Sequence, residues 1–78
     1  MKLLIAKVDE TLYQGEVYSV TLPTAAGEVT ILGEHMPLAT TLKEGIIRIR
    51  KEKDSAFEEF SVTKGVLEVT RDGATVLL

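Results

Sequence analysis

Glycine and proline recur at short intervals along this chain, and their spacing restricts its fold more than any other feature. Eight such residues divide the 78 positions into short pieces: Gly15, Pro23, Gly27, Gly33, Pro37, Gly45, Gly65 and Gly73. None of the pieces shows sustained helical periodicity, and short strands separated by turn residues at regular spacing are typical of sandwiches and barrels. We therefore predict an all-β, two-sheet β-sandwich of about eight to ten short, mostly antiparallel strands.

Period-two alternation of apolar side chains indicates where individual strands lie. The segment from Glu16 to Leu22 alternates throughout, and we expect one strand that ends at Pro23, which has no amide donor. The segment from Gly45 to Lys51 also alternates. Its residues Ile47 and Ile49 are predicted to face the core, with the intervening arginines on the solvated face.

Three further segments carry specific predictions. Phe57 and Phe60 fall on opposite parities, which indicates either a β-bulge at Glu58-Glu59 or an edge position for Phe57. The pair Asp72-Gly73 separates two alternating runs and predicts a hairpin. The run from Leu3 to Ala6 is apolar on both parities, so we expect a strand that is covered on both sides.

Length and composition exclude several classes of protein. The chain is long enough for one domain, residues 1–78, and has no cysteine and one histidine, which excludes thiolate zinc clusters and cysteine nucleophiles. A net charge of −3 without a basic face disfavours nucleic-acid binding. The longest apolar run near the start is too short for a membrane span, so any membrane association is expected to go through a partner.

Candidate catalytic and metal-binding residues are few. His35 is the one possible histidine base, and the sequence does not place a serine beside it. Glu58 and Glu59 are adjacent on a strand, so they point to opposite faces and do not share a site. Glu28, Glu34 and His35 form a weak metal-ligand pattern with loose spacing, and no phosphate-binding glycine motif is present. We expect no catalytic residue, no metal and no cofactor.

The segment from Gly27 to Leu38 contains more specialised residues than a plain turn needs. Gly27 and Gly33 are able to adopt positive φ, and Pro37 favours an extended backbone before it. We interpret the segment as a shaped loop that offers Glu28, His35 and Met36 to another protein. The alternative interpretation is a well-ordered loop whose polar groups are satisfied internally.

Motifs along nearly the whole chain resemble the epsilon subunit of F-type ATP synthases, which is called delta in mitochondria. They are Gly15-Glu16-Val17, Gly27-Glu28, Ile31-Leu32, His35-x-Pro37-Leu38, Leu42-x-x-Gly45-x-x-Arg48-Ile49, Phe60-Ser61-Val62, Gly65-Val66-Leu67-Glu68-Val69 and Ala74-Thr75-Val76-Leu77. Two departures are that Gly33-Glu34 replaces the family's Pro-Gly and that Lys64-Gly65 replaces its double glycine. The C-terminal helical hairpin common in this family is absent from these 78 residues.

The resemblance implies a non-catalytic rotor subunit of the central stalk, which docks to the gamma subunit and to the c ring and couples proton or sodium transport to ATP synthesis. By position, Glu28 matches an acid expected to face the c-ring loops, and His35, Pro37 and Thr40 match neighbouring docking residues. Met36 and Leu38 are expected to supply apolar contact.

The resemblance also implies a peripheral location on the cytoplasmic face of a bacterial inner membrane, or on an organellar inner or thylakoid membrane. The alternatives to the rotor subunit are a free-standing β-sandwich module that binds a peptide or small ligand, and an enzyme built on His35.

Overall fold

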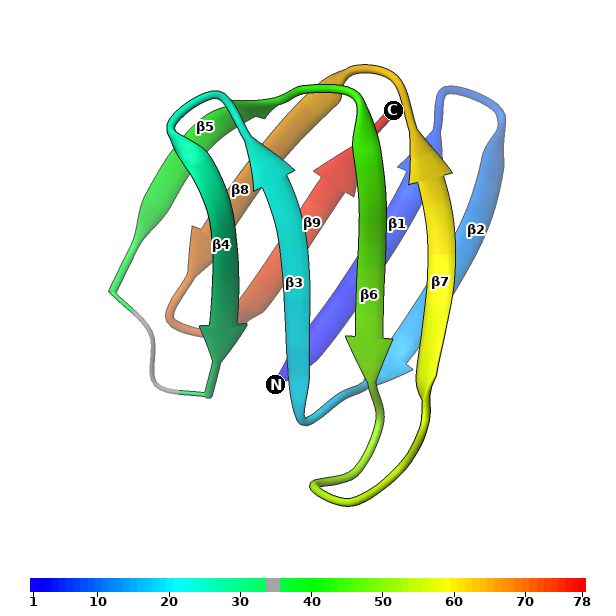
Figure 1. Cartoon of the computed structure of the whole chain (residues 1–78), viewed down its shortest axis with the longest axis vertical. Coiled ribbons are helices and arrows are strands. Elements are labelled where there is room, and N and C mark those ends of the chain that lie inside the picture. Colours follow the sequence, from blue (N-terminus) through cyan, green and yellow to red (C-terminus); the bar gives the residue numbers. More distant parts are fainter. Residues whose placement is uncertain (34–35) are drawn as a thin grey trace.

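A computed structural model describes residues 1–33 and 36–78, and these residues form nine strands without a helix (Figure 1). The strands are β1 (Lys2–Lys7), β2 (Glu10–Glu16), β3 (Ser19–Thr24), β4 (Gly27–Leu32), β5 (Leu38–Leu42), β6 (Gly45–Arg50), β7 (Phe57–Val62), β8 (Gly65–Thr70) and β9 (Gly73–Leu77).

The strands form two facing layers of one curled sheet. The front layer in Figure 1 has the order β4-β3-β6-β7, and the back layer has the order β2-β1-β9-β8-β5. The layers join where Thr24 of β3 pairs with Leu42 of β5. Among the described strands, β1 and β9 pair in parallel and the other neighbours are antiparallel. The predicted all-β, mostly antiparallel sandwich is confirmed.

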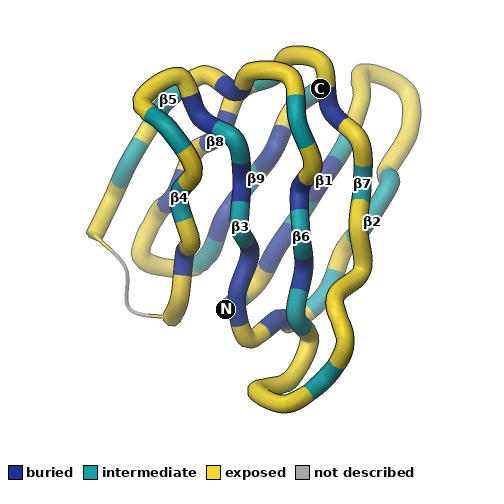
Figure 2. Tube along the Cα trace, viewed as in Figure 1, coloured by how far each residue is buried: buried dark blue, intermediate teal, exposed yellow. Residues whose placement is uncertain are grey.

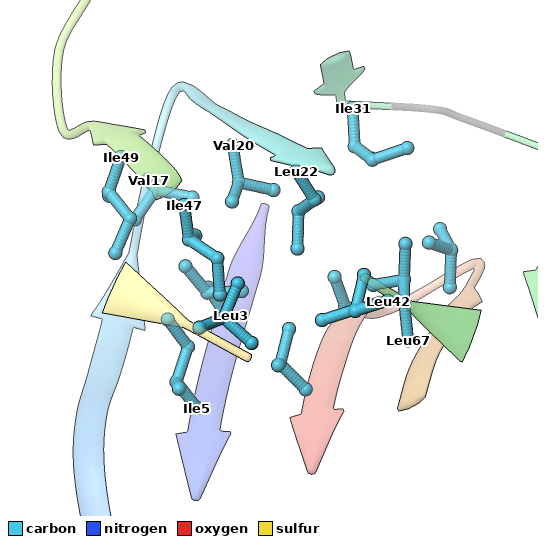
Figure 3. Close-up of a cluster of buried hydrophobic side chains, with 14 residues drawn as sticks. Leu3, Ile5, Val17, Val20, Leu22, Ile31, Leu42, Ile47, Ile49 and Leu67 are labelled. Carbon is cyan, nitrogen blue, oxygen red and sulfur yellow. The ribbon is translucent and has the colours of Figure 1, made fainter. Parts of the chain in front are cut away.

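The hydrophobic core fills the space between the two layers (Figures 2 and 3). Every second residue of the central strands points inward, and the buried apolar residues are Leu3, Ile5, Val17, Val20, Leu22, Ile31, Leu42, Ile47, Ile49, Val62, Leu67, Val69, Ala74 and Val76. The predicted inward orientation of Ile47 and Ile49 is confirmed. Fully burying a side chain of this size contributes about 1.5 to 3 kcal/mol, so this core is the main source of stability.

The segment from Glu16 to Leu22 is not a single strand, contrary to the prediction. β2 ends at Glu16, and β3 begins at Ser19 in the other layer. Between them, the Val17 amide donates to the Met1 carbonyl at 2.8 Å and the Tyr18 amide donates to the Arg50 carbonyl at 2.8 Å. The alternation breaks at this corner, because Val17 is buried and Tyr18 is 42% exposed, whereas Val20 and Leu22, which share the parity of Tyr18, are buried within β3.

Pro23 does not end its strand, contrary to the prediction. β3 continues to Thr24, and Pro23 pairs with Glu28 of β4. A strand residue directs its carbonyl and its amide nitrogen to the same side, and the Pro23 carbonyl accepts a hydrogen bond from the Lys43 amide at 2.9 Å. The missing donor therefore faces away from β4, toward β6, whose pairing with β3 ends at Thr21. Proline removes no ladder hydrogen bond at this position.

The predicted bulge in β7 is wrong, and the alternative edge position of Phe57 is confirmed. β7 pairs with β6 without a register shift from Val62 to Phe57, and it has no other partner among the described strands. Phe57 lies on the outer face under the Arg50 guanidinium, whose Cζ is 4.3 Å from the ring centroid. Phe60 lies on the inner face and meets Tyr13 of β2 edge to face, with the centroids 6.2 Å apart.

β1 is covered on one face only, so the prediction of a strand covered on both sides is wrong. Leu3 and Ile5 are buried, whereas Leu4 and Ala6 are partly exposed on the outer face of the back layer. Both edges of β1 are paired, with β2 and β9, and its apolar outer side chains are tolerated on this central strand. The predicted hairpin is confirmed, since Thr70 pairs with Gly73 across a two-residue turn.

Candidate docking surface

Glu28 lies on strand β4, whereas the sequence interpretation placed it on a loop. The turn before β4 is held by Thr24, whose hydroxyl donates to the Gly27 carbonyl at 2.6 Å and accepts from the Ala26 amide at 3.2 Å. Gly27 has a φ of 118°, a conformation that strongly favours glycine. Gly33 has no such φ. Of the two glycines expected to shape this segment by positive φ, only Gly27 does so.

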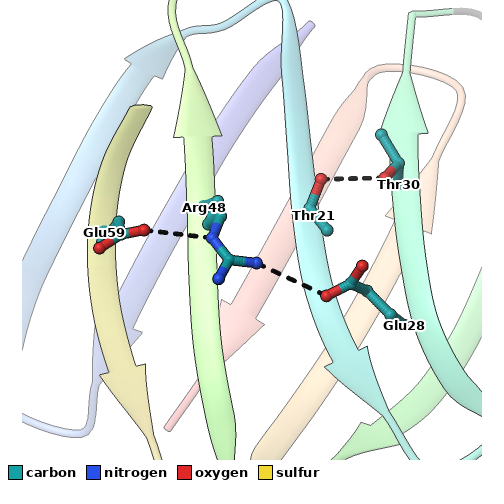
Figure 4. A network of polar contacts seen from close by, with 5 residues as sticks. All are labelled: Thr21, Glu28, Thr30, Arg48 and Glu59. Atoms are coloured by element: carbon teal, nitrogen blue, oxygen red, sulfur yellow. Dashed lines mark hydrogen bonds and ion pairs between the residues drawn. The ribbon is translucent and has the colours of Figure 1, made fainter. Parts of the chain in front are cut away.

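Arg48 of β6 binds two carboxylates on the outer face of the front layer (Figure 4). Its Nε donates to Glu59 Oε2 of β7 at 3.1 Å, and its Nη1 lies 3.6 Å from Glu28 Oε2. Exposed ion pairs contribute about 0 to 1 kcal/mol to stability. The Glu28 side chain is 65% exposed and makes the longer contact, so Arg48 orients its carboxylate while leaving the side chain accessible.

Cross-strand register arranges this face in rows. One row runs from Thr30 through Thr21 and Arg48 to Glu59, and the two threonine hydroxyls are 2.9 Å apart. The next row runs through Leu32, Ser19, Arg50 and Phe57. Leu32 and Phe57 are exposed large hydrophobic residues. The face therefore combines a charged centre with an apolar margin, which suits contact with another protein.

The remaining predicted docking residues divide into accessible and inward-facing groups. Met36, which is 78% exposed, and Pro37 lie on the surface just before β5. Leu38 is partly buried against the core, and Thr40 lies on the inner face of β5 opposite Leu67 of β8. His35 lies outside the described residues, as does Glu34. The structure thus leaves Glu28, Met36 and Pro37 available for contact.

Sequence reasoning missed the residues that surround Glu28. Arg48 was assigned to a solvated face and Glu59 was considered only with Glu58, because period-two alternation gives the face of a residue but not its neighbour on the next strand. Thr30 and Leu32 share the parity of Glu28 along β4. That shared parity was the one available signal that a surface, and not a loop, presents the carboxylate.

A hollow formed by described residues lies away from this face. It has a volume of about 440 Å³ on the back layer, and its lining includes Lys2, Leu4, Gln14, Gly73 and Thr75. None of the predicted site residues lines it. No three potential metal ligands cluster among the described side chains, and no described helix is long and apolar enough to span a membrane.

The fold is a small β-sandwich, and the outer face of one layer presents an exposed, partly paired carboxylate beside exposed apolar side chains. The family model for the ATP synthase delta/epsilon chain, β-sandwich domain, matches residues 1–78. The chain belongs to this family, which confirms the resemblance seen in its motifs.

Curated relatives and solved structures agree with the family. The chain is 41% identical over 78 residues to an ATP synthase epsilon chain of Sulfurimonas denitrificans, covering 100% of this chain and 59% of the relative. It is 36% identical over 77 residues to ATP synthase epsilon chain 2 of Burkholderia orbicola, covering 99% and 51%. The chain thus spans between half and three fifths of these relatives.

Two solved assemblies contain chains with the same fold. A chain of the Euglena gracilis mitochondrial ATP synthase structure, described as OSCP/F1/c-ring, matches with a TM-score of 0.87 at 23% identity, covering 96% of this chain and 48% of that one. A chain of the Tetrahymena thermophila mitochondrial ATP synthase central stalk/c-ring structure matches with a TM-score of 0.80 at 18% identity, covering 99% and 61%.

Proposed function

We propose that this domain is a non-catalytic part of the central-stalk rotor of a rotary F-type ATP synthase. It docks to the gamma subunit and the c ring, and in this way helps couple proton or sodium transport to ATP synthesis. The observation that carries the proposal is the family match over all 78 residues. The accessible, partly paired carboxylate of Glu28 on a rigid strand supports it, because docking needs positioned contacts and no reaction chemistry.

Glu28 is the polar element of the proposed contact. A carboxylate at this position attracts basic residues of the c-ring loops, and Arg48 holds it in place without covering it. Because an exposed pair contributes only about 0 to 1 kcal/mol, apolar burial has to supply more of the binding energy. Met36 is the most exposed apolar residue next to β5, and Pro37 extends the same segment.

His35, Leu38 and Thr40 stay in the proposal as neighbours of this contact. Leu38 and Thr40 lie on the inner face of β5, so their proposed role is to fix the strand that follows Met36 and Pro37. The domain is proposed to be peripheral, held at the cytoplasmic face of a bacterial inner membrane, or at an organellar inner or thylakoid membrane, through the complex.

The direct test is binding to the proposed partners. Purified gamma subunit, alone and assembled with the c ring, is mixed with this domain and analysed by size-exclusion chromatography. We expect co-elution with gamma and a tighter complex when the c ring is present. Separate elution from both at micromolar concentration would contradict the rotor assignment.

A further inference from the structure

Three described strands, β2, β4 and β7, have only one partner and expose an edge of the sheet. Unpaired edges recruit other strands unless charges, bulges or proline block them. β7 carries Glu58 and Glu59, and β2 has a register shift opposite Ile5 and Ala6. β4 pairs with β3 over six regular positions, has one charged residue, Glu28, and has no proline. Its edge is the least protected of the three.

Hydrogen bonds near the β3-β4 turn show which backbone groups of β4 are free. The Pro23 carbonyl accepts from Lys43, and the Ala25 amide donates to Thr41, so both point away from β4. By alternation, Thr24 and every second residue before it face β4, and their register partners are Gly27, Val29 and Ile31. The amides and carbonyls of the residues between these partners therefore point to the open edge, and those residues are Glu28, Thr30 and Leu32.

We propose that the free edge of β4 receives an extended segment of a partner subunit as an added antiparallel strand, with a lysine or arginine of that segment opposite Glu28. This proposal rests on the proposed function and specifies the binding mode of the same surface. Main-chain hydrogen bonds from an added strand supply affinity, and alternate side chains supply specificity.

The charges on the outer face indicate the basic side chain. Arg48 makes its shorter contact with Glu59, at 3.1 Å, and its longer contact with Glu28, at 3.6 Å. Glu28 keeps accessible carboxylate oxygens, and side chains directly opposite on paired strands have Cβ atoms about 4.5 to 5.5 Å apart. A cation on the added strand would lie within reach of Glu28. An apolar side chain would then fall opposite the exposed Leu32.

The same charges disfavour a second copy of this chain as the added strand. Antiparallel pairing of two β4 strands about Thr30 would set Glu28 opposite Leu32 of the copy and give the carboxylate no cation. Pairing about Glu28 would set two carboxylates against each other, which is destabilising. A five-residue partner segment avoids both conflicts when its first residue is apolar, its third is β-branched and its fifth is basic.

Amide hydrogen exchange measured by NMR tests the proposal on the domain alone and bound to gamma or to the gamma-c ring assembly. We expect new protection at Thr30 and Leu32 on binding, while Val29 and Ile31 are protected in both states. Binding that leaves the amides of Thr30 and Leu32 exchanging at the free rate would overturn the edge proposal and leave the proposed function intact.

A matched pair of proline variants separates the edge from the fold. Thr30→Pro removes an outward amide of β4 without removing a main-chain hydrogen bond to β3, and it also removes the exposed hydroxyl contact with Thr21. Ser61→Pro is the control, because register through Thr21 and Arg48 places the Ser61 amide on the open edge of β7. We expect Thr30→Pro to weaken docking about tenfold or more, as for the loss of one hydrogen bond of about 1.5 kcal/mol, with Ser61→Pro within about twofold of the unmodified domain. Retained protection of Ile31 confirms that β4 still pairs. Equal affinities for both variants would overturn the proposal.

A short peptide tests the edge without any subunit. The probe is acetylated Val-Ile-Thr-Val-Lys amide, and its control replaces lysine with glutamate. If the lysine peptide protects the Thr30 amide from hydrogen exchange in a saturable way, and the glutamate peptide protects it less, the edge proposal is supported. This result supports the edge even if gamma and the c ring do not bind and the proposed function is wrong. The absence of any protection at about 1 mM peptide overturns it. Protection that grows with the concentration of the domain alone would instead assign the edge to a second copy.

Discussion

The outer faces of the two layers differ in chemistry although both cover the same core. The front layer carries the Glu28, Arg48 and Glu59 ion pairs, beside exposed Leu32 and Phe57. Across the middle of the back layer, Val66 pairs with Leu77 and both are exposed, with partly exposed apolar residues of β1 alongside. Charged groups give direction and register to a contact, whereas an apolar face mainly gives area. We therefore assign the oriented docking contact to the front layer.

The largest expected effect is on the free energy of unfolding, and it differs between the two faces of a single front-layer strand, β6. Ile47→Ala removes a fully buried side chain, and we expect a loss of about 2 to 5 kcal/mol in the free energy of unfolding. Ile46→Ala, one residue away on the outer face and 39% exposed, should cost less than about 1 kcal/mol. Urea denaturation measures both. Similar losses would mean that the layer does not have one buried and one exposed face.

The next effect concerns close approach in the back layer. A Cβ at Gly73 would collide with the backbone carbonyl of Lys2, where β1 and β9 pair. We expect Gly73→Ala to cost about 1 to 3 kcal/mol. The control, Gly33→Ala, meets nothing within 4 Å and should lie within about 1 kcal/mol of the unmodified domain. Thermal unfolding compares the midpoint temperatures of the two variants. Equal midpoints would contradict the close approach of β1 and β9.

Reversing the charge of Glu28 is expected to act on docking and leave the fold intact. Glu28→Arg removes the carboxylate that is proposed to bind a cation of the partner. It also places a second positive charge beside Arg48, whose ion pair with Glu59 remains. We expect about tenfold weaker binding to the gamma-c ring assembly, about 1.4 kcal/mol, and an unfolding free energy changed by less than about 1 kcal/mol. Glu10→Arg, an equal charge change on exposed β2 of the back layer, controls for net charge. Equal weakening by both variants would remove Glu28 from the contact.

The smallest effect tests whether the back layer takes part in the same contact. Val66→Lys places a charge on its exposed apolar face. With docking assigned to the front layer, binding to the gamma-c ring assembly should change by less than about twofold, well below 1 kcal/mol. Isothermal titration calorimetry measures the dissociation constants of the variant and of the unmodified domain, and their ratio gives the change. A loss equal to that of Glu28→Arg would place the back layer in the interface.

Much of the fold was predictable from local patterns. The alternation around Ile47 and the residue pair Asp72-Gly73 identified β6 and the β8-β9 hairpin, because strand period and turn chemistry act over a few residues. Pro23 was misread, and the two alternatives for Phe57 stayed open, because the placement of both residues depends on which side of the strand has a neighbour. That information is tertiary, and no single segment contains it.

The candidate site was predictable as residues but not as a surface. The sequence and the family resemblance selected Glu28, Met36 and Pro37, which the structure leaves accessible. They did not indicate that Arg48, from another strand, contacts both Glu28 and Glu59. Such contacts follow from cross-strand register, which here links positions 20 and 11 residues apart, Glu28 with Arg48 and Arg48 with Glu59.

The measurement that tests the central claim most directly is NMR mapping of this domain, isotopically labelled, during titration with purified gamma subunit and with the gamma-c ring assembly. We predict that shift changes and line broadening concentrate on the outer face of the front layer, at Glu28, Thr30 and Leu32, and at Met36. Changes concentrated at Val66 and Leu77, with the front layer unaffected, would contradict it.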